Sequence, residues 1–172
     1  NKMSTGSTLP HELGHAYLLH KANFNNEPNI FIEAYSIFIE FIFGDYLKNT
    51  RYSGVAYSSE YQRLDSFLGM IDYEFANLSR LKDMYFTFPF YYYSDGSLAR
   101  IDSAKMILSD MLGMYFVSLY RFDKKKYNIM MSAFLDMYGK VTDEEILKYF
   151  KLSNLVDGSI DTLDTYVKTY RR

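Results

Sequence analysis

Two residue types are missing from this chain: its 172 residues contain no cysteine and no tryptophan. Without cysteine, neither a disulfide framework nor a thiolate metal site can form. A chain without cysteine fits a reducing compartment, and we therefore expect a cytoplasmic protein.

An excess of charge of one sign is also missing, because 19 basic residues stand against 21 acidic ones and give a net charge of -2. No dense stripe of lysine and arginine appears, which argues against nucleic acid or an anionic membrane as a partner. Long apolar runs are absent too. The most apolar stretch, residues 31–43, is only about half of a membrane span and contains Glu33 and Glu40, so we expect no transmembrane helix.

Aromatic residues are abundant, with 18 tyrosines and 14 phenylalanines. A tyrosine ring can pack in a core while its hydroxyl still donates a hydrogen bond, so we expect many of these residues to be structural. The chain is long enough to bury a core, and we expect residues 1–172 to form a single helical domain. The first residue is asparagine rather than methionine, and we expect the chain to be a fragment of a longer protein.

Apolar periodicity indicates helices along almost the whole chain and predicts an all-α, multi-helix bundle. A first helix is expected from a cap at Ser7 or Thr8 to about residue 22. Further helices are expected over residues 29–48, 58–83, 97–120, 123–139, 142–152 and from 159 onwards. Residues 84–97 mix aromatic residues with proline and glycine and are expected to form a loop. Thr142 and Glu145 have the spacing of a capping box.

The strongest functional signal is an H-E-x-x-H motif, HELGH, at residues 11–15. Residues four apart on a helix share a face, so His11 and His15 can bind one Zn²⁺ ion. Glu12 is placed to take a proton from a zinc-activated water, as a general base. The alternative is a chance match, which we expect on the order of a few times per thousand such chains.

Glu33 is the predicted third zinc ligand. It follows His15 at a distance that allows a turn and an antiparallel second helix, and it lies in the otherwise apolar segment 30–40. A carboxylate in such surroundings costs on the order of several kcal/mol unless a cation compensates it. Glu40 lies two helical turns further on the same face. It is expected either to accept a hydrogen bond from a ligating histidine or to pair with a distant lysine or arginine. His20 lies off the face of the motif and is expected at the surface or in packing.

Residues 7–16 (STLPHELGHA) and 31–40 (FIEAYSIFIE) resemble the metal-binding segments of the thimet oligopeptidase and oligoendopeptidase F family of zinc metallopeptidases. Beyond these segments the similarity covers nearly the whole chain at low specificity. The resemblance implies a zincin-like fold in which the H-E-x-x-H helix packs against a helix that bears the third ligand, Glu33. It also implies hydrolysis of peptide bonds in oligopeptide substrates.

Residues 88–96 (FPFYYYSDG) look like the tyrosine-rich segment with which this family contacts the peptide and the oxyanion. Tyr91 and Tyr93 fit the tyrosine positions best, and Tyr92 is the alternative register. A phenol beside the zinc would stabilise the charge that develops on the scissile carbonyl. In the other interpretation these rings fill the core and its rim.

The chain also departs from the family pattern. Tyr85 stands near the place of a family histidine, Leu18 replaces another, and the connection from His15 to Glu33 is short. Members are several times longer, and we expect their N-terminal helical half, which walls a channel over the zinc, to be missing here. The predicted function is that of a zinc metalloendopeptidase. The rivals are a non-catalytic helical fragment with a binding or structural role and a different zinc hydrolase with the same motif.

Overall fold

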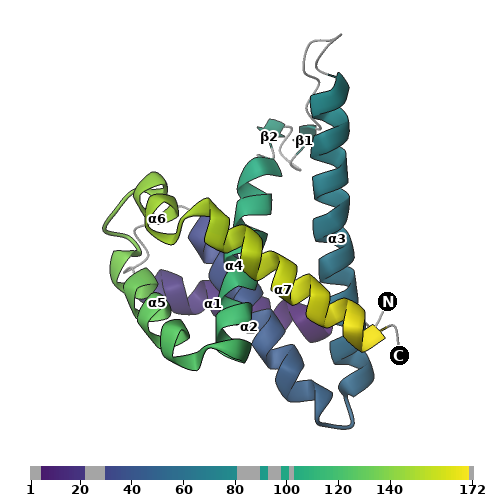
Figure 1. Ribbon diagram of the computed structural model, residues 1–172. Coiled ribbons are helices and arrows are strands. Elements are labelled where there is room, and N and C mark those ends of the chain that lie inside the picture. The colour runs from purple at the N-terminus through teal and green to yellow at the C-terminus, as the bar shows by residue number, and fades with distance from the viewer. Residues whose placement is uncertain (1–4, 22–29, 81–89, 93–97, 101–102, 171–172) are drawn as a thin grey trace.

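The computed structural model describes residues 5–21, 30–80, 90–92, 98–100 and 103–170 (Figure 1). Within these residues the helices are α1 (Thr5–Lys21), α2 (Ile30–Lys48), α3 (Ser53–Arg80), α4 (Ser103–Phe122), α5 (Lys124–Met137), α6 (Asp143–Phe150) and α7 (Leu152–Tyr170). Two short strands, β1 (Phe90–Tyr92) and β2 (Leu98–Arg100), pair in an antiparallel ribbon. The predicted all-α class is confirmed, with this ribbon as the one addition among the described residues.

Helices α2 and α4 lie at the centre of the molecule and pack against each other. Helices α1 and α3 pack on α2, and α7 crosses over α4 (Figure 1). Helices α5 and α6 lie at the end of the molecule away from α3. The strongly apolar sequence of α2 follows from this central position, because a helix covered on several sides is apolar around most of its circumference.

The core is an aromatic cluster centred on Phe116 of α4. Its ring centroid lies 5.2 Å from that of Phe134 on α5 and 5.5 Å from that of Phe150 on α6, both edge-on. All three side chains are at most 1% exposed. Burying such a ring contributes roughly 1.5–3 kcal/mol to stability. Tyr115 and Tyr138 are buried as well, so the structural role expected for many aromatic residues is confirmed for these.

Arg121 on α4 forms ion pairs with residues of α2 and α3. Arg121 donates to both carboxylate oxygens of Asp45 on α2, at 2.8 and 2.7 Å, and to Glu60 on α3 at 3.2 Å. The bidentate contact fixes the orientation as well as the distance of the two groups. This bridge holds the first half of α3 against α2 and α4.

The capping box is confirmed at the start of α6. The Thr142 hydroxyl accepts a hydrogen bond from the Glu145 backbone N–H, and the Glu145 carboxylate accepts one from the Thr142 backbone N–H. Two orphan donors at the helix start are thereby satisfied by residues in the local sequence, which is why the sequence alone predicted the motif.

Several predicted boundaries are wrong. Helix α4 begins at Ser103 and not at residue 97, because residues 98–100 form β2. Residues 90–92 form β1 where a loop was expected, and the remainder of the expected loop lies outside the described residues. Helix α3 begins at Ser53 rather than at residue 58, and α1 begins at Thr5.

The start of α7 is the largest error, since the helix begins at Leu152 and not near residue 159. Gly158 lies inside the helix because α7 approaches α4 closely there. A Cβ atom at this position would come within 2.7 Å of the Tyr115 Cα. The glycine therefore serves packing between helices and does not mark a helix end.

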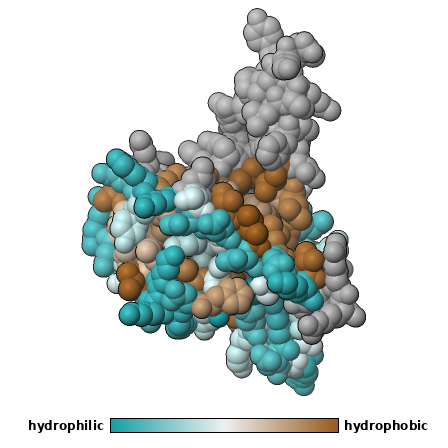
Figure 2. Space-filling view, viewed as in Figure 1, coloured by the Kyte–Doolittle hydropathy of each residue, from teal (hydrophilic) through white to brown (hydrophobic). Residues whose placement is uncertain are grey.

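The surface carries both hydrophilic and hydrophobic areas. Hydrophilic residues cover much of the face shown in Figure 2, and a hydrophobic area is visible between α3 and the layer formed by α4 and α7. Among the described residues, no helix combines the length and the apolar character needed to span a bilayer.

Candidate metal centre

The candidate site lies between α1 and α2, two helices that pack along each other. His11 and His15 are one turn apart on α1, and Glu33 and Glu40 are two turns apart on α2. Each pair therefore shares one face of its helix. The described structure brings all four side chains together.

The motif glycine, Gly14, allows the close approach of the two helices. A Cβ atom at this position would lie 2.7 Å from both the Cα and the Oγ of Ser36 on α2. Ser36 is fully buried at this contact. A residue with a side chain at position 14 would push α1 away from α2, so the glycine sets the distance across which the histidines meet the glutamates.

Three donor groups converge on one point. The Nε2 atoms of His11 and His15 are 3.0 Å apart. The Glu33 carboxylate oxygens lie 3.4 Å from the His11 Nε2 and 3.5 Å from the His15 Nε2. Tetrahedral zinc with bonds of about 2.0–2.1 Å places neighbouring ligand atoms about 3.3–3.4 Å apart. The two Glu33 distances are close to the edges of such a coordination shell, although one is to Oε2 and the other to Oε1. The 3.0 Å between the imidazole nitrogens is shorter than such an edge.

The chemistry of the donors also fits a cation better than hydrogen bonding. A single N–H on one imidazole can satisfy only one of the acceptors that face it, since the His15 nitrogen and the Glu33 carboxylate both lie in front of His11. A metal ion at the point of convergence would engage all three lone pairs. Two imidazoles and one carboxylate form a donor set typical of catalytic zinc, in which a fourth position stays open.

The two glutamates raise the affinity of His11 for a proton. The pKa of His11 is raised to about 9, mainly by its hydrogen bond to Glu33 and then by Glu40. Burial lowers the pKa of His15, and the hydrogen bond to His11 lowers that of Glu33. His11 thus carries the proton while His15 presents a lone pair, as expected for two ring nitrogens in contact.

Glu12, the predicted general base, is close enough to His11 and His15 to share an ion with them. Its side chain is exposed, and a carboxylate oxygen lies within 4.8 Å of ring nitrogens of both His11 and His15. The arrangement suits a group that moves a proton at the open face of the site.

Glu40 lies behind His11. Its Oε2 is 3.4 Å from the His11 Nδ1, on the side of the ring opposite Nε2. An acceptor in this position directs the Nε2 lone pair toward the point of convergence. His20, on the exposed face of α1, is not part of the cluster.

The side chains of the predicted tyrosines lie outside the described residues. Tyr91 pairs with Ala99 in the ribbon through its backbone, but its side chain lies outside the described residues. Tyr93 and Tyr85 lie outside them altogether. A role for these residues at an oxyanion stays a prediction. Leu18 is fully buried in the core.

Two charged residues near the cluster were missed by the sequence reasoning. Arg63 on α3 lies with its Nη2 2.7 Å from the Oδ1 of Asp110 on α4, and its charge lowers the pKa of Glu33. Burial raises the pKa of Asp110 to about 6, against the opposing effect of Arg63. Asp110 had a detectable signal, since it is an acidic residue within the apolar segment 107–117. Arg63 had none, because an arginine in the mixed polar and apolar segment 61–65 (YQRLD) is typical of an ordinary amphipathic helix.

Comparisons with protein-family models, with curated proteins and with solved structures gave no significant match.

Proposed function

We propose that the chain is the zinc-binding catalytic part of a metallopeptidase that hydrolyses peptide bonds in short peptides. One observation carries the proposal: the Glu33 carboxylate lies 3.4 and 3.5 Å from the two imidazole nitrogens of the H-E-x-x-H motif. A carboxylate of α2 at that distance would be unexpected if the motif were a chance match on an ordinary helix.

The resemblance to the thimet oligopeptidase and oligoendopeptidase F family supports the same proposal. In this interpretation His11, His15 and Glu33 hold the zinc in a zincin-like pairing of helices. The oligopeptide substrate and a cytoplasmic location are parts of the proposal that come from the sequence.

Each residue of the site then has a defined task. Bound zinc supplies a Lewis acid that acidifies water and polarises a carbonyl oxygen. Glu12 accepts the proton of the attacking water and returns it to the nitrogen of the leaving amine. Glu40 holds the His11 Nδ1, which keeps the ring in the orientation that the site requires. Tyr91 or Tyr93 is proposed to donate to the oxyanion.

The proposal is tested by elemental analysis of the purified chain together with cleavage of fluorescence-quenched peptides. We expect about one zinc per chain. The Glu12→Gln variant should keep zinc and lose peptidase activity by about 10²–10⁴-fold, because only the proton acceptor is removed. His15→Ala should lose the metal, and the matched variant His20→Ala should keep it.

Two results would contradict parts of the proposal. Peptidase activity that survives Glu12→Gln would rule out this carboxylate as the base. Bound zinc without cleavage of any peptide would favour the alternative, a non-catalytic helical piece that binds metal and serves a structural or binding role.

A further inference from the structure

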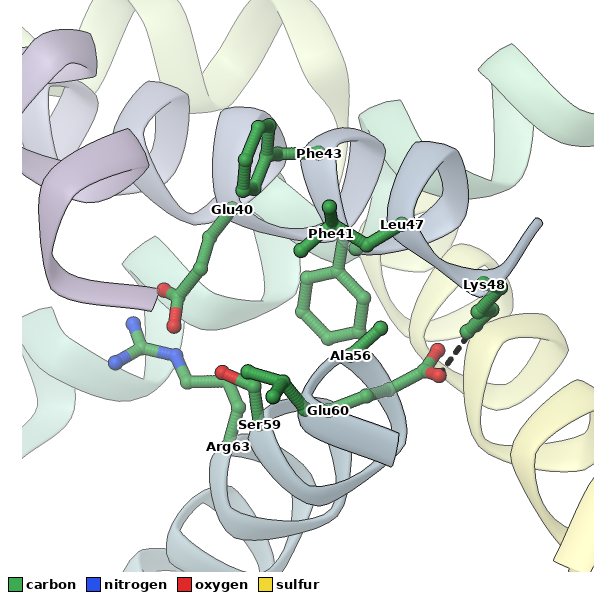
Figure 3. Close-up of a pocket in the computed structure, with 11 residues that line it drawn as sticks. Glu40, Phe41, Phe43, Leu47, Lys48, Ala56, Ser59, Glu60 and Arg63 are labelled. Atoms are coloured by element: carbon green, nitrogen blue, oxygen red, sulfur yellow. Dashed lines mark ion pairs between the residues drawn. The ribbon is translucent and has the colours of Figure 1, made fainter. Parts of the chain in front are cut away.

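Helices α2 and α3 enclose a largely apolar pocket beside the end of α2 (Figure 3). It is lined by one face of α2 between residues 40 and 48 and by one face of α3 between residues 55 and 63. The pocket contains about 390 Å³ of empty space, including its open mouth. Pockets for small ligands typically measure roughly 300–1,000 Å³, so this one has room for a group of the size of one large side chain.

Gly44 lies at the centre of the α2 face that lines this pocket, since it follows Glu40 by one helical turn and precedes Lys48 by one. Glycine inside a helix is less favourable than alanine. Close packing of helices explains Gly14, where a Cβ atom would lie 2.7 Å from Ser36, but no atom lies within 4 Å of a Cβ built at Gly44. Gly44 is nevertheless half-buried. A side chain at position 44 would occupy the pocket, so the glycine keeps this space free.

The side chains around Gly44 are mainly apolar. Phe41 and Ala56 line the pocket as buried residues, and Leu47 as a half-buried one. Phe43 and Val55 line it as exposed residues. Apolar side chains that border an empty space lack the contacts that a filled core provides, so an apolar occupant would restore contacts that these residues now lack.

The charged residues that line the pocket already have partners. The Glu40 Oε2 lies 3.4 Å from the His11 Nδ1, and Arg63 pairs with a buried aspartate of α4. Lys48 pairs with Glu60 (Figure 3). Two acidic and two basic residues line the pocket, so its wall has no net charge. A charged occupant would have to displace one of these partners, which is unfavourable at a partly buried site.

We infer that this pocket is a binding site for an uncharged aromatic or branched aliphatic group. Such a group has two sources, a free small molecule or the side chain of a bound peptide. The inference does not depend on zinc, because none of the predicted zinc ligands lines the pocket. Glu40 lines the pocket and also lies against His11, so an occupant is separated from the candidate metal centre by one side chain.

The experiment titrates the protein with three substituted benzenes and follows the methyl NMR signals of Leu47, Val55 and Ala56. Benzyl alcohol is uncharged, benzylammonium is a cation and benzoate is an anion. We expect benzyl alcohol to shift these signals with a Kd on the order of 1 mM. Both charged compounds should bind at least about tenfold more weakly, because burying a charge without a partner is unfavourable.

Gly44→Leu tests the location, because the new side chain fills the pocket from the centre of its α2 face. It should weaken the binding of benzyl alcohol by about tenfold or more, since an occupied pocket has no room for the ring. Gly69→Leu on α3 is the matched control. Gly69 is also a helical glycine with no atom within 4 Å of its Cβ position, but it does not line the pocket. If Gly44→Leu does not fold, Gly44→Ala is used, and a several-fold loss of affinity is expected.

A competition experiment identifies the source of the group. A blocked peptide that contains one phenylalanine displaces benzyl alcohol if the pocket accepts a peptide side chain, and the same peptide with alanine in its place does not. Displacement by neither peptide assigns the pocket to a free small molecule.

Three results overturn the inference: no signal shift with benzyl alcohol, equal binding of the charged compounds, or unchanged binding in the folded Gly44 variant. Zinc content and peptidase activity are measured separately, so a failure of the proposed function leaves this test intact.

Discussion

Gly14→Ala is the substitution whose consequences the structure defines best. The new Cβ atom would lie 2.7 Å from the Ser36 Cα, a backbone atom that cannot swing aside. Carbon atoms pack at about 3.5–4.0 Å, so α1 and α2 must separate by roughly 1 Å. A zinc site tolerates errors of only about 0.2 Å in its ligand distances. The separation therefore pulls His11 and His15 away from Glu33 by more than the site can absorb.

Two opposing effects decide the stability of this variant. Alanine is favoured over glycine in a helix by about 1 kcal/mol. Overpacking at a close helix contact costs about 1–3 kcal/mol. We expect a net destabilisation between about 0 and 2 kcal/mol, together with zinc binding weakened on the order of tenfold or more. Urea denaturation of the metal-free protein and chelator competition measure the two quantities separately.

Gly69→Ala on α3 is the matched control, because no atom lies within 4 Å of a Cβ built there. It should gain up to about 1 kcal/mol and leave zinc binding unchanged. If Gly14→Ala behaves in the same way, with tighter folding and unaltered zinc affinity, then the glycine does not set the distance between the helices and the reasoning is refuted.

Two further predictions concern stability. Asp110 has a pKa of about 6 in the folded protein, raised by burial above its ordinary value of 3.8, so its contribution to stability is fully present below pH 3.8 and lost as the pH rises to about 6. Urea denaturation across this range should show that decline in wild type relative to Asp110→Asn, and parallel pH profiles of the two would contradict it. Phe116→Ala should lose about 3–5 kcal/mol in the same assay, because it empties the centre of the aromatic core. A loss below about 1 kcal/mol would mean that the neighbouring rings collapse into the space.

Local signals in the sequence predicted the parts of the fold that local chemistry determines. The capping box at Thr142 and Glu145 is complete within four residues, and the predicted span of α2, 29–48, lies within one residue of the observed bounds. Gly158 shows the opposite case. Glycine is a common helix breaker, and only the contact with Tyr115, far away in the sequence, explains why it lies inside α7.

The residues of the candidate site also fall into two groups: those that the local sequence predicts and those that only tertiary packing reveals. His11, Glu12 and His15 lie in one motif on one helix, and Glu33 was found because an acidic residue interrupts an apolar segment. The Asp110–Arg63 pair depends on the packing of α3 against α4, which no sequence period encodes. A tertiary contact between charged residues on two helices is visible only once the helices are placed.

Few side chains of α1 are fully buried, so an ion bound between α1 and α2 would stabilise their packing. Among the described side chains of α1, only Pro10, Gly14 and Leu18 are buried, and of these only Leu18 brings a large apolar side chain to the core. Leu19 packs on the core while half-buried, and Tyr17 stacks on Tyr35 of α2. A helix with so few fully buried side chains opens locally more easily than one with a continuous buried face. An ion bound by two residues of α1 and one of α2 would stabilise the packed arrangement by about 4 kcal/mol at a free concentration 1,000 times its Kd. In this account Glu12 stays at an open face, and a bound metal would add to the attachment that burial of α1 provides.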